Sequence, residues 1–333
     1  MYRGKAIGVV VPAHNEESFI GPVIDTMPSF VDRAYIVDDC SRDGTWDEIL
    51  EHTEQATARR VAPFASDGGQ ELDSRIVPIR HETQQGRGAA VKTGYRQALA
   101  DEMDVIAVMD GDGQMDPDIL DQILDPVVAG EADYSVGNRL SNTRHLVGMP
   151  PFRLFGNVLL MGLTRISSGY WHIRDPQNGY TAVSADTLRD IDMESLYDQY
   201  GFLNDMLVKL NVHGKRVASV PMPSRYGDEE SGIRYSTFIP KLSALLLRNF
   251  VWRLWVKYTK SGVHPVVVLY VIGALATLIG VLQTGWRVLT RRGETERSMQ
   301  MSLLGVASLL SAMMGDKKNS DELSSSGRRK FRR

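Results

Sequence analysis

The chain of 333 residues is long enough for one large domain or two modest ones, and its 43% hydrophobic and 24% charged residues exclude a disordered or collagen-like protein. A single cysteine, Cys40, excludes an internal disulfide framework. The net charge of −3 conceals an asymmetry, because residues 1–233 carry 21 basic and 36 acidic side chains, whereas residues 234–333 carry 17 and 5. An acidic front and a basic back indicate two different environments.

Strands and helices alternate along the first part of the chain. Apolar runs rich in β-branched residues predict strands, and the longer stretches between them predict helices, which is the pattern of βαβ units with a parallel sheet. Strands that are apolar throughout fit a sheet covered on both faces. The predicted strands cover residues 6–11, 34–37, 76–79 and 105–109, and the predicted helices cover residues 16–28, 45–58, 88–102 and 117–129.

Polar and acidic side chains follow most of these strands. Asn15 and Glu16 come after the first strand, Asp38 and Asp39 end the second, and Asp110 begins a polar segment after the fourth. Helix capping explains one acid at each junction, but not two pairs of acids placed directly after buried strands. Because ligands of parallel sheets bind outside these strand ends, and because crowded acids repel each other, a cation or a polar ligand is expected here.

The segment after the fourth strand has the spacing of a divalent-cation site. Alternate residues of an extended segment point the same way, so Asp110 and Asp112 can reach one cation, and Gln114 adds a carbonyl oxygen. Gly111 and Gly113 allow the backbone to turn tightly. Such an all-oxygen set suits Mg²⁺ or Mn²⁺ held jointly with a diphosphate.

The basic C-terminal part predicts an attachment to a membrane. Residues 234–260 are predicted to form amphipathic interfacial helices, although a core helix could show the same apolar stripe. Residues 261–286 contain no Asp, Glu, Lys or Arg, and residues 298–315 form a second charge-free run. The stripe of the interfacial segment consists of Phe238, Leu242, Leu245 and Leu246, with Trp252 and Trp255 placed for the headgroup level.

We expect residues 261–315 to hold two transmembrane helices, at about 263–283 and 298–315. Basic residues before the first helix and after the second place both ends of this hairpin on the cytoplasmic side. The apolar run at the N-terminus is too short for a signal peptide. The protein is therefore predicted to be a multi-pass cell-membrane protein with its catalytic domain, residues 1–233, on the cytoplasmic face. The basic tail, residues 316–333, is predicted to be disordered.

Five short motifs, VVVPAHNEE, IVDDCSRDGT, GRGAA, VMDGDGQMDP and DPQNGY, occur in the order typical of family 2 inverting glycosyltransferases. Over residues 5–230 the set resembles that of polyprenyl-phosphate (dolichyl-phosphate) glycosyltransferases, such as the dolichyl-phosphate mannose and glucose synthases. The resemblance implies a GT-A fold, a UDP- or GDP-linked nucleotide-sugar donor, Mg²⁺ or Mn²⁺, and a polyprenyl or dolichyl phosphate acceptor. It further implies transfer with inversion, which would supply a lipid-linked sugar for glycan assembly or protein glycosylation, with no nucleic-acid partner.

The resemblance also implies roles for residues on the donor side. One group matches positions that hold the base and ribose of the nucleotide, and Asp38 supports this group or shapes the turn. A second group matches a loop near the donor, in which the family more often has Lys at the position of Arg87. A third matches the metal and diphosphate site. The three groups are Pro12, Asn15, Glu16 and Asp39; Gly86, Arg87 and Gly88; and Asp110, Asp112 and Gln114.

On the acceptor side, the family places two arginines and a small polar residue against the acceptor phosphate. Arg139, Arg153 and Asn157 match these positions, although a hydroxyl residue would be expected at Asn157. Arginine suits phosphate because its guanidinium donates bidentately. Arg225 and Tyr226 begin a polar stretch before the membrane segment, which is predicted to close over the donor as a lid.

Two further acids have roles that depend on the acceptor. Asp175, which opens DPQNGY, is implied to line the reaction centre, and Asp205 resembles the acidic element that supplies a base in many inverting transferases. A phosphate monoester is largely dianionic at neutral pH and attacks without a base. A sugar hydroxyl needs one, such as Asp205 or Asp175. A transferase that extends a lipid-linked saccharide at a sugar hydroxyl therefore stays open as an alternative.

Other classes fit the sequence less well. A haloacid-dehalogenase-like phosphatase would use Asp110 as nucleophile, but Gln114 stands where that class has Thr. A processive polysaccharide synthase usually carries a Q-x-x-R-W motif and more spans, which this sequence lacks. A non-catalytic membrane scaffold is disfavoured by the intact set of Asp110, Asp112 and Gln114.

Overall fold

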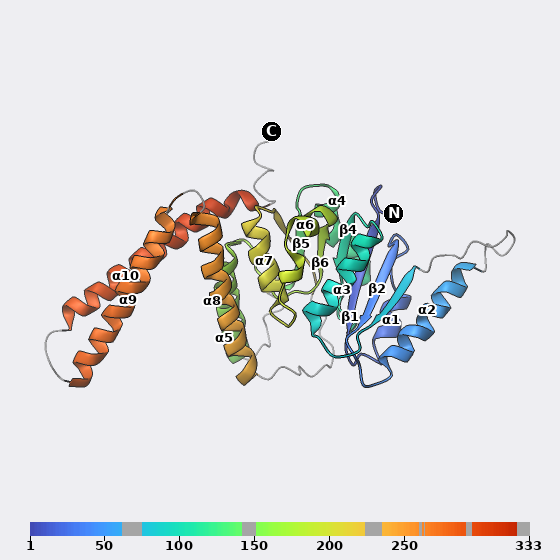
Figure 1. The fold of residues 1–333 in the computed structure, drawn as a ribbon, viewed down its shortest axis with the longest axis horizontal. Helices are drawn as coiled ribbons and strands as arrows, with labels where there is room; N and C mark the ends of the chain where they lie inside the picture. The colour runs from blue at the N-terminus through green and yellow to red at the C-terminus, as the bar shows by residue number, and fades with distance from the viewer. Residues whose placement is uncertain are drawn as a thin grey trace.

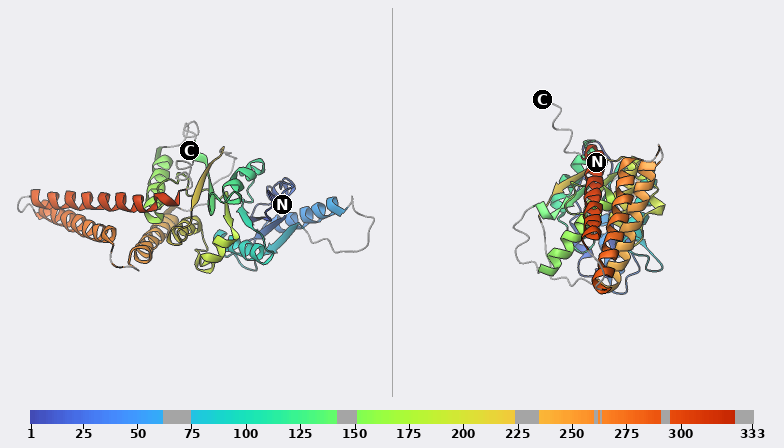
Figure 2. Two further views of the ribbon diagram at one scale, coloured as in Figure 1. Left: turned by 90° about the horizontal axis from the view of Figure 1, so that it is seen from above. Right: turned by 90° about the vertical axis from the view of Figure 1, so that its left-hand side faces the viewer.

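The computed structural model describes residues 1–61, 75–141, 151–223, 235–259, 262, 264–290 and 295–324. These residues form a sheet with helices on both faces, and two long C-terminal helices that project from one end of this body (Figure 1). The view from above likewise shows the helix pair extending away from the sheet (Figure 2).

Seven strands of the described chain form a single mixed sheet, in the order β3-β2-β1-β4-β6-β5-β7. The pairs β3–β2, β2–β1, β1–β4 and β5–β7 are parallel, whereas β6 is antiparallel to both β4 and β5. The strands are β1 (Ile7–Ala13), β2 (Arg33–Asp38), β3 (Ile76–Arg80), β4 (Val105–Val108), β5 (Tyr134–Asn138), β6 (Thr181–Ser184) and β7 (Val217–Pro221).

Helices cover both faces of this sheet. Residues of α3, α6 and α7 form one buried cluster with one face of the strands, and residues of α1, α2 and α4 form another with the opposite face. Val10 belongs to the first cluster and its neighbours Val9 and Val11 to the second, as the period of a strand requires. The α-helices are α1 (Ile20–Asp25), α2 (Thr45–Val61), α3 (Arg87–Ala100), α4 (Leu120–Val128), α5 (Pro151–Ser168), α6 (Ala185–Asp190), α7 (Phe202–Val212), α8 (Tyr235–Thr259), α9 (Pro265–Thr290) and α10 (Glu296–Ser320).

The predicted α/β fold is confirmed, and its first four strands and the helices between them lie where the sequence placed them. The predicted parallel sheet is only partly confirmed, because β6 runs antiparallel to its neighbours. The strands β5, β6 and β7 were not predicted. These later strands are only four or five residues long. Short apolar runs of that length do not distinguish a strand from a buried helix.

The predicted interfacial segment forms one helix, α8, but its apolar stripe does not face outward. Leu242, Leu245 and Leu246 are buried and pack against Leu160 and Tyr197 of the catalytic body. The prediction that this stripe faces a membrane is therefore wrong, and the core-helix alternative holds for it. The side chain of Phe238 lies outside the described residues.

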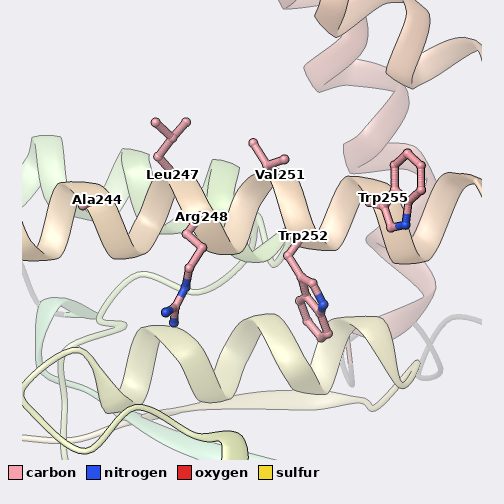
Figure 3. A pocket seen from close by; sticks show the side chains of 6 residues that line it. All are labelled: Ala244, Leu247, Arg248, Val251, Trp252 and Trp255. Carbon is pink, nitrogen blue, oxygen red and sulfur yellow. The ribbon is translucent and has the colours of Figure 1, made fainter.

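A different face of α8 is apolar and exposed. Leu247 and Val251 point to one side of the helix, and Trp255 rises from its next turn, whereas Arg248 and Trp252 point the other way (Figure 3). Together with Ala244, these residues line a shallow hollow on the helix surface. Trp255 is 70% exposed, which is costly for an indole in water.

The helices α9 and α10 form a hairpin with little protein around it. Both are long and apolar enough to cross a membrane, yet only 22% and 17% of their most apolar windows are buried, so they are not core helices of the described body. They pack closely against each other, since a Cβ at Gly280 would lie 2.7 Å from the Ser298 carbonyl oxygen. The helix α9 continues beyond the end of the predicted span 263–283, and α10 extends beyond both ends of the predicted span 298–315.

The C-terminal end of α10 returns to the catalytic body. Asp316 and Arg253 are both fully buried and form an ion pair (2.7 Å). Oδ1 of Asp316 also accepts a hydrogen bond from the Tyr258 hydroxyl (2.6 Å). The same guanidinium donates to the Ile166 and Ser167 carbonyl oxygens at the end of α5. The prediction of a disordered tail from residue 316 is therefore wrong as far as residue 324, because this segment is held by buried polar contacts.

Candidate active site

The carboxyl ends of β1, β2 and β4 meet at one edge of the sheet. Ala13 pairs with Asp38 in the register of β1 and β2, and the Gly111 N–H donates to the Pro12 carbonyl oxygen (3.2 Å) at the ends of β1 and β4. The three polar segments singled out in the sequence follow these strands. They therefore lie side by side, although their members are up to about a hundred residues apart in the chain.

Asp38 shapes the turn after β2. The side chain is fully buried, and its Oδ1 accepts hydrogen bonds from the Ser41 N–H (3.0 Å) and the Ser41 hydroxyl. Its Oδ2 lies 3.2 Å from Nε of Arg80. These contacts fit the turn-forming role that was the alternative to nucleotide support.

Asp39 ties this turn to the 85–88 segment, which leads into α3. Its Oδ1 accepts from the Gln85 N–H (2.8 Å) and lies 2.8 Å from Nδ1 of His81, and its Oδ2 accepts from the Gly86 N–H (2.7 Å). The side chain is only 4% exposed. Asp39 therefore fixes the shape of the 85–88 segment beside the edge of the sheet.

Asn15 and Glu16 hold the loop after β1 against the same turn. Asn15 adopts a left-handed backbone (φ +58°), which asparagine tolerates better than most residues. Its N–H donates to Oγ of Ser41 (2.9 Å), and its Oδ1 accepts from the Arg42 N–H (2.9 Å). The Glu16 N–H donates to Oγ1 of Thr45 (2.8 Å).

The predicted metal site contains an ion pair. Oδ1 of Asp110 accepts from Nε (2.9 Å) and Nη2 (2.6 Å) of Arg87, so the donor-side loop and the acidic segment meet. Burial alone would lower the pKa of Arg87, but the Asp110 carboxylate raises it, and the guanidinium stays charged. Asp112 and Gln114 follow on the same segment, and the Gln114 N–H donates to Oδ1 of Asp112 (3.0 Å).

This set of oxygen ligands fits a divalent cation that is coordinated jointly by the protein and by a phosphate of the substrate. Within the described residues, no group of three His, Cys, Asp or Glu side chains could hold a metal ion alone. Mg²⁺ is commonly bound by one or two carboxylates together with substrate phosphates, and the oxygens of Asp110, Asp112 and Gln114 fit that pattern. The Arg87 guanidinium beside Asp110 shows that this carboxylate is already paired with a positive charge.

Gly179 is the residue that allows this pair to form beside the DPQNGY segment. A Cβ there would lie 2.3 Å from Nη2 of Arg87 and 2.5 Å from Oδ2 of Asp110, too close for real contacts. We expect Gly179→Ala to separate the pair and to lower catalytic turnover by about tenfold or more, because small misplacements at reacting centres are costly. Steady-state kinetics check this, with Gly162→Ala as control, since a Cβ at Gly162 meets nothing. Equal activity of the two variants would contradict it.

Asp175 and Arg139 form a second ion pair at this end of the sheet. Oδ2 of Asp175 accepts from Nε (2.8 Å) and from the backbone N–H (3.2 Å) of Arg139, and Oδ1 accepts from Nη2 (3.1 Å). Asp175 is buried, whereas the Arg139 side chain is 38% exposed. The acid thus holds one edge of the guanidinium.

Some predicted site residues fall outside what the structure describes. Arg153 and Asn157 lie on α5, one turn apart, but their side chains are outside the described residues. Arg225 and Tyr226, predicted as a lid, belong to residues 224–234, which are likewise outside the described chain.

Asp205 is placed differently from the predicted base. It lies in the first turn of α7, and its side chain is only 4% exposed. Its oxygens accept from the Tyr197 N–H (3.0 Å) and from Nδ2 of Asn249 (2.8 Å), and Nζ of Lys209 lies 3.3 Å away. A buried carboxylate that is bound by three donors is poorly suited to take a proton from an acceptor, so this placement disfavours the predicted role of Asp205 as a base.

The glycosyl transferase family 2 model matches residues 8–192, which carry the whole edge described above. The chain belongs to this family. It is accordingly a glycosyltransferase, and the resemblance seen in its motifs is confirmed.

Two curated relatives of this glycosyltransferase carry a lipid phosphate in their names. It is 27% identical over 223 residues to UDP-N-acetylglucosamine–dolichyl-phosphate N-acetylglucosaminyltransferase of Methanococcus voltae, covering 67% of this chain and 86% of the relative. It is 31% identical over 218 residues to undecaprenyl-phosphate mannosyltransferase of Micrococcus luteus, covering 64% and 81%.

Solved structures agree on the fold. Glucosyl-3-phosphoglycerate synthase from Mycobacterium tuberculosis, solved in complex with Mg²⁺ and UDP, matches with a TM-score of 0.51 and 18% identity, covering 75% of this glycosyltransferase and 79% of that chain. This likeness supports the predicted GT-A-like architecture.

The structure adds residues to the site of this glycosyltransferase that sequence reasoning missed. His81 bridges Asp39 and Oγ1 of Thr93 (3.0 Å), and Gly179 admits the Arg87 guanidinium. His81 directly follows β3, the one early strand without an acid at its end, and that position was the available signal. Gly179 lies in the DPQNGY motif, and that motif was the available signal for it.

Proposed function

We propose that this glycosyltransferase moves a sugar from a nucleotide-sugar to a polyprenyl phosphate such as dolichyl phosphate, with inversion. The product is a lipid-linked sugar for glycan assembly or protein glycosylation. The names of the relatives from Methanococcus voltae and Micrococcus luteus support this acceptor class. The nucleotide is UDP or GDP.

One observation carries the choice of acceptor: both acids that could serve as bases are already bound by cationic side chains. Asp175 accepts three hydrogen bonds from Arg139, and Asp205 is buried beside Lys209. An acceptor with a hydroxyl nucleophile needs a base, whereas a phosphate dianion does not. The arrangement favours the phosphate acceptor over extension of a lipid-linked saccharide.

In this mechanism the chain's own residues bind and orient the reactants. Asp39 and the 85–88 segment shape the donor side, and Asp112 with Gln114 offers oxygens to a cation beside the diphosphate. A bound Mg²⁺ or Mn²⁺ would stabilise the charge that develops on the leaving diphosphate. Arg139, oriented by Asp175, would hold the acceptor phosphate in line for displacement at the anomeric carbon.

The C-terminal helices would place this site at a membrane surface. Both helices of the hairpin are apolar and exposed, and the exposed face of α8 with Leu247, Val251 and Trp255 lies next to it in the chain. We place the catalytic domain on the cytoplasmic face and both hairpin ends on the same side. The buried contact between Asp316 and Arg253 supports the second placement, because it joins the end of α10 to the catalytic body.

The proposal is tested with membranes containing the full chain, Mg²⁺ or Mn²⁺, a polyprenyl phosphate and a panel of labelled nucleotide-sugars. Metal-dependent appearance of label in the lipid phase is the expected result, and it identifies the donor. Label that appears only when a lipid-linked saccharide replaces the polyprenyl phosphate would instead support the hydroxyl-acceptor alternative.

Arg139→Ala is expected to raise the KM for polyprenyl phosphate by about tenfold to a hundredfold, because a hydrogen bond to a charged group contributes about 1.5–3 kcal/mol. The KM for the nucleotide-sugar should hardly change. Kinetics with each substrate varied in turn check this, with Arg189→Ala as control, since Arg189 is an exposed arginine paired only with Asp186 among the contacts described. An effect confined to the donor KM would contradict the acceptor role.

A further inference from the structure

Residues 197–199 lie directly against the 85–88 segment. The Ala89 N–H donates to the Asp198 carbonyl oxygen (3.0 Å), and Nε2 of Gln199 donates to the Gln85 carbonyl oxygen (2.8 Å). A Cβ at Gly88 would lie 2.3 Å from the Tyr197 carbonyl oxygen, so the two backbones touch. Any displacement of residues 197–199 must therefore move the 85–88 segment.

The opposite side of residues 197–199 is held by the carboxylate of Asp205. Its Oδ2 accepts from the Tyr197 N–H, and its Oδ1 accepts from Nδ2 of Asn249 on α8. One carboxylate thus connects the 197–199 residues to α8. Both Asp205 and Asn249 are buried, where hydrogen bonds are electrostatically stronger than in water.

Packing reinforces this connection. Tyr197 packs against the buried leucines of α8, and a Cβ at Gly201 would lie 2.1 Å from Cδ2 of Leu245. Asn249 is also one turn from Arg253, whose guanidinium pairs with Asp316 of α10. The contacts run without a break from the C-terminal hairpin, through α8 and Asp205, to the 85–88 segment.

We propose that Asp205 is a positioning residue through which the seating of α8 sets the geometry of the 85–88 segment, and with it nucleotide affinity. The proposal rests on the function proposed above, because it takes the 85–88 segment to be part of the donor site. Asp39 also binds this segment, because its Oδ2 accepts a hydrogen bond from the Gly86 N–H. A glycosyltransferase built in this way binds its donor best when α8 is correctly seated.

The test uses the full-length protein in detergent and the variant Asn249→Ala, which touches neither substrate. Hydrogen–deuterium exchange at residues 85–89 is expected to speed up, and the Kd of UDP or GDP with Mn²⁺ is expected to rise about fivefold or more, as typical coupling energies imply. Asp205→Asn removes the negative charge and leaves one acceptor oxygen, so it cannot accept hydrogen bonds from both Tyr197 and Asn249. It should act in the same direction, raising the KM for the donor by a larger factor than it lowers turnover.

The matched control is Ser167→Ala. It removes the hydrogen bond from the Ser167 hydroxyl to the Leu246 carbonyl oxygen (3.1 Å), another buried contact of α8 that does not involve Asp205. It should lower thermal stability but change exchange at residues 85–89 much less than Asn249→Ala does, because it leaves the contacts of Asp205 in place. Unchanged exchange in Asn249→Ala, or equal changes in both variants, would overturn the proposal. A wild-type protein that binds neither nucleotide would overturn the proposed function. The exchange rates at residues 85–89 would still test whether Asp205 couples α8 to the 85–88 segment.

Discussion

Asp112→Ala is expected to lower transfer of sugar to the lipid phase by about 10²- to 10³-fold, the usual effect of removing one group that stabilises charge in a transition state. Asp112 follows the buried strand β4, and its Oδ1 is already oriented by the Gln114 N–H. Asp110, the other carboxylate of this segment, is paired with Arg87. We therefore expect the loss of the Asp112 oxygens to weaken the binding of a divalent cation beside the diphosphate.

The measurement is the lipid-phase labelling assay, repeated over a range of Mn²⁺ concentrations. Asp118→Ala serves as the control, because Asp118 is an exposed acid in the short 3₁₀ helix that follows the same segment. It should stay within about twofold of the wild type, as surface substitutions usually do. Activity of Asp112→Ala that recovers fully at high Mn²⁺ would show weakened metal binding, whereas activity equal to the control would rule out a metal role for Asp112.

The first half of the fold could be predicted because its signals are local. The early strands are mostly apolar runs, and Asp38–Asp39 at the end of β2 and Asp110 after β4 mark where two of them end, so that one edge of the sheet could be inferred. The later strands lack such marks. The stripe of Leu242, Leu245 and Leu246 shows a further limit, since helical spacing identifies a buried face but not what covers it.

The candidate site was predicted as a set of residues but not as a set of pairs. Arg87 and Asp110 are 23 residues apart, Arg139 and Asp175 are 36 apart, and the contact of Asp39 with His81 spans 42. Only the folded sheet brings these partners together. Their pairing changes the chemistry, because an acid bound by arginine positions a phosphate site better than it removes a proton.

The end of α10 shows how a basic tail can conceal an ordered segment. Its basic charge indicated disorder, and nothing in the sequence shows that Asp316, which is followed by Lys317 and Lys318, has a partner elsewhere in the chain. In the structure that partner is Arg253 of α8, 63 residues away. Lys257 adds to the same contact, donating to Oδ1 of Asn211 (2.9 Å) and to Oγ of Ser320 (3.1 Å), and burial together with Arg253 lowers its pKa to about 8.

Asp316→Ala is expected to destabilise the protein by about 3–5 kcal/mol, because it leaves the Arg253 guanidinium buried without its partner. This corresponds to a fall in Tm of about 10 °C. The hairpin should also loosen from the catalytic body, since Asp316 on α10 binds both Arg253 and Tyr258 of α8. Thermal unfolding of the full-length protein in detergent measures the first effect, and protease sensitivity at the end of α10 measures the second.

Two comparisons separate this prediction from a general loss of packing. Asp186→Ala breaks an ion pair in which Asp186 is 91% exposed, and it should leave the Tm nearly unchanged. The double variant Arg253→Met with Asp316→Leu removes both charges and should recover much of the lost stability, because apolar residues of similar volume can replace a buried ion pair. Recovery in the double variant identifies the unpaired charge as the cause. A double variant as unstable as Asp316→Ala would show instead that the hydrogen bonds of Arg253 to the end of α5 hold the hairpin in place.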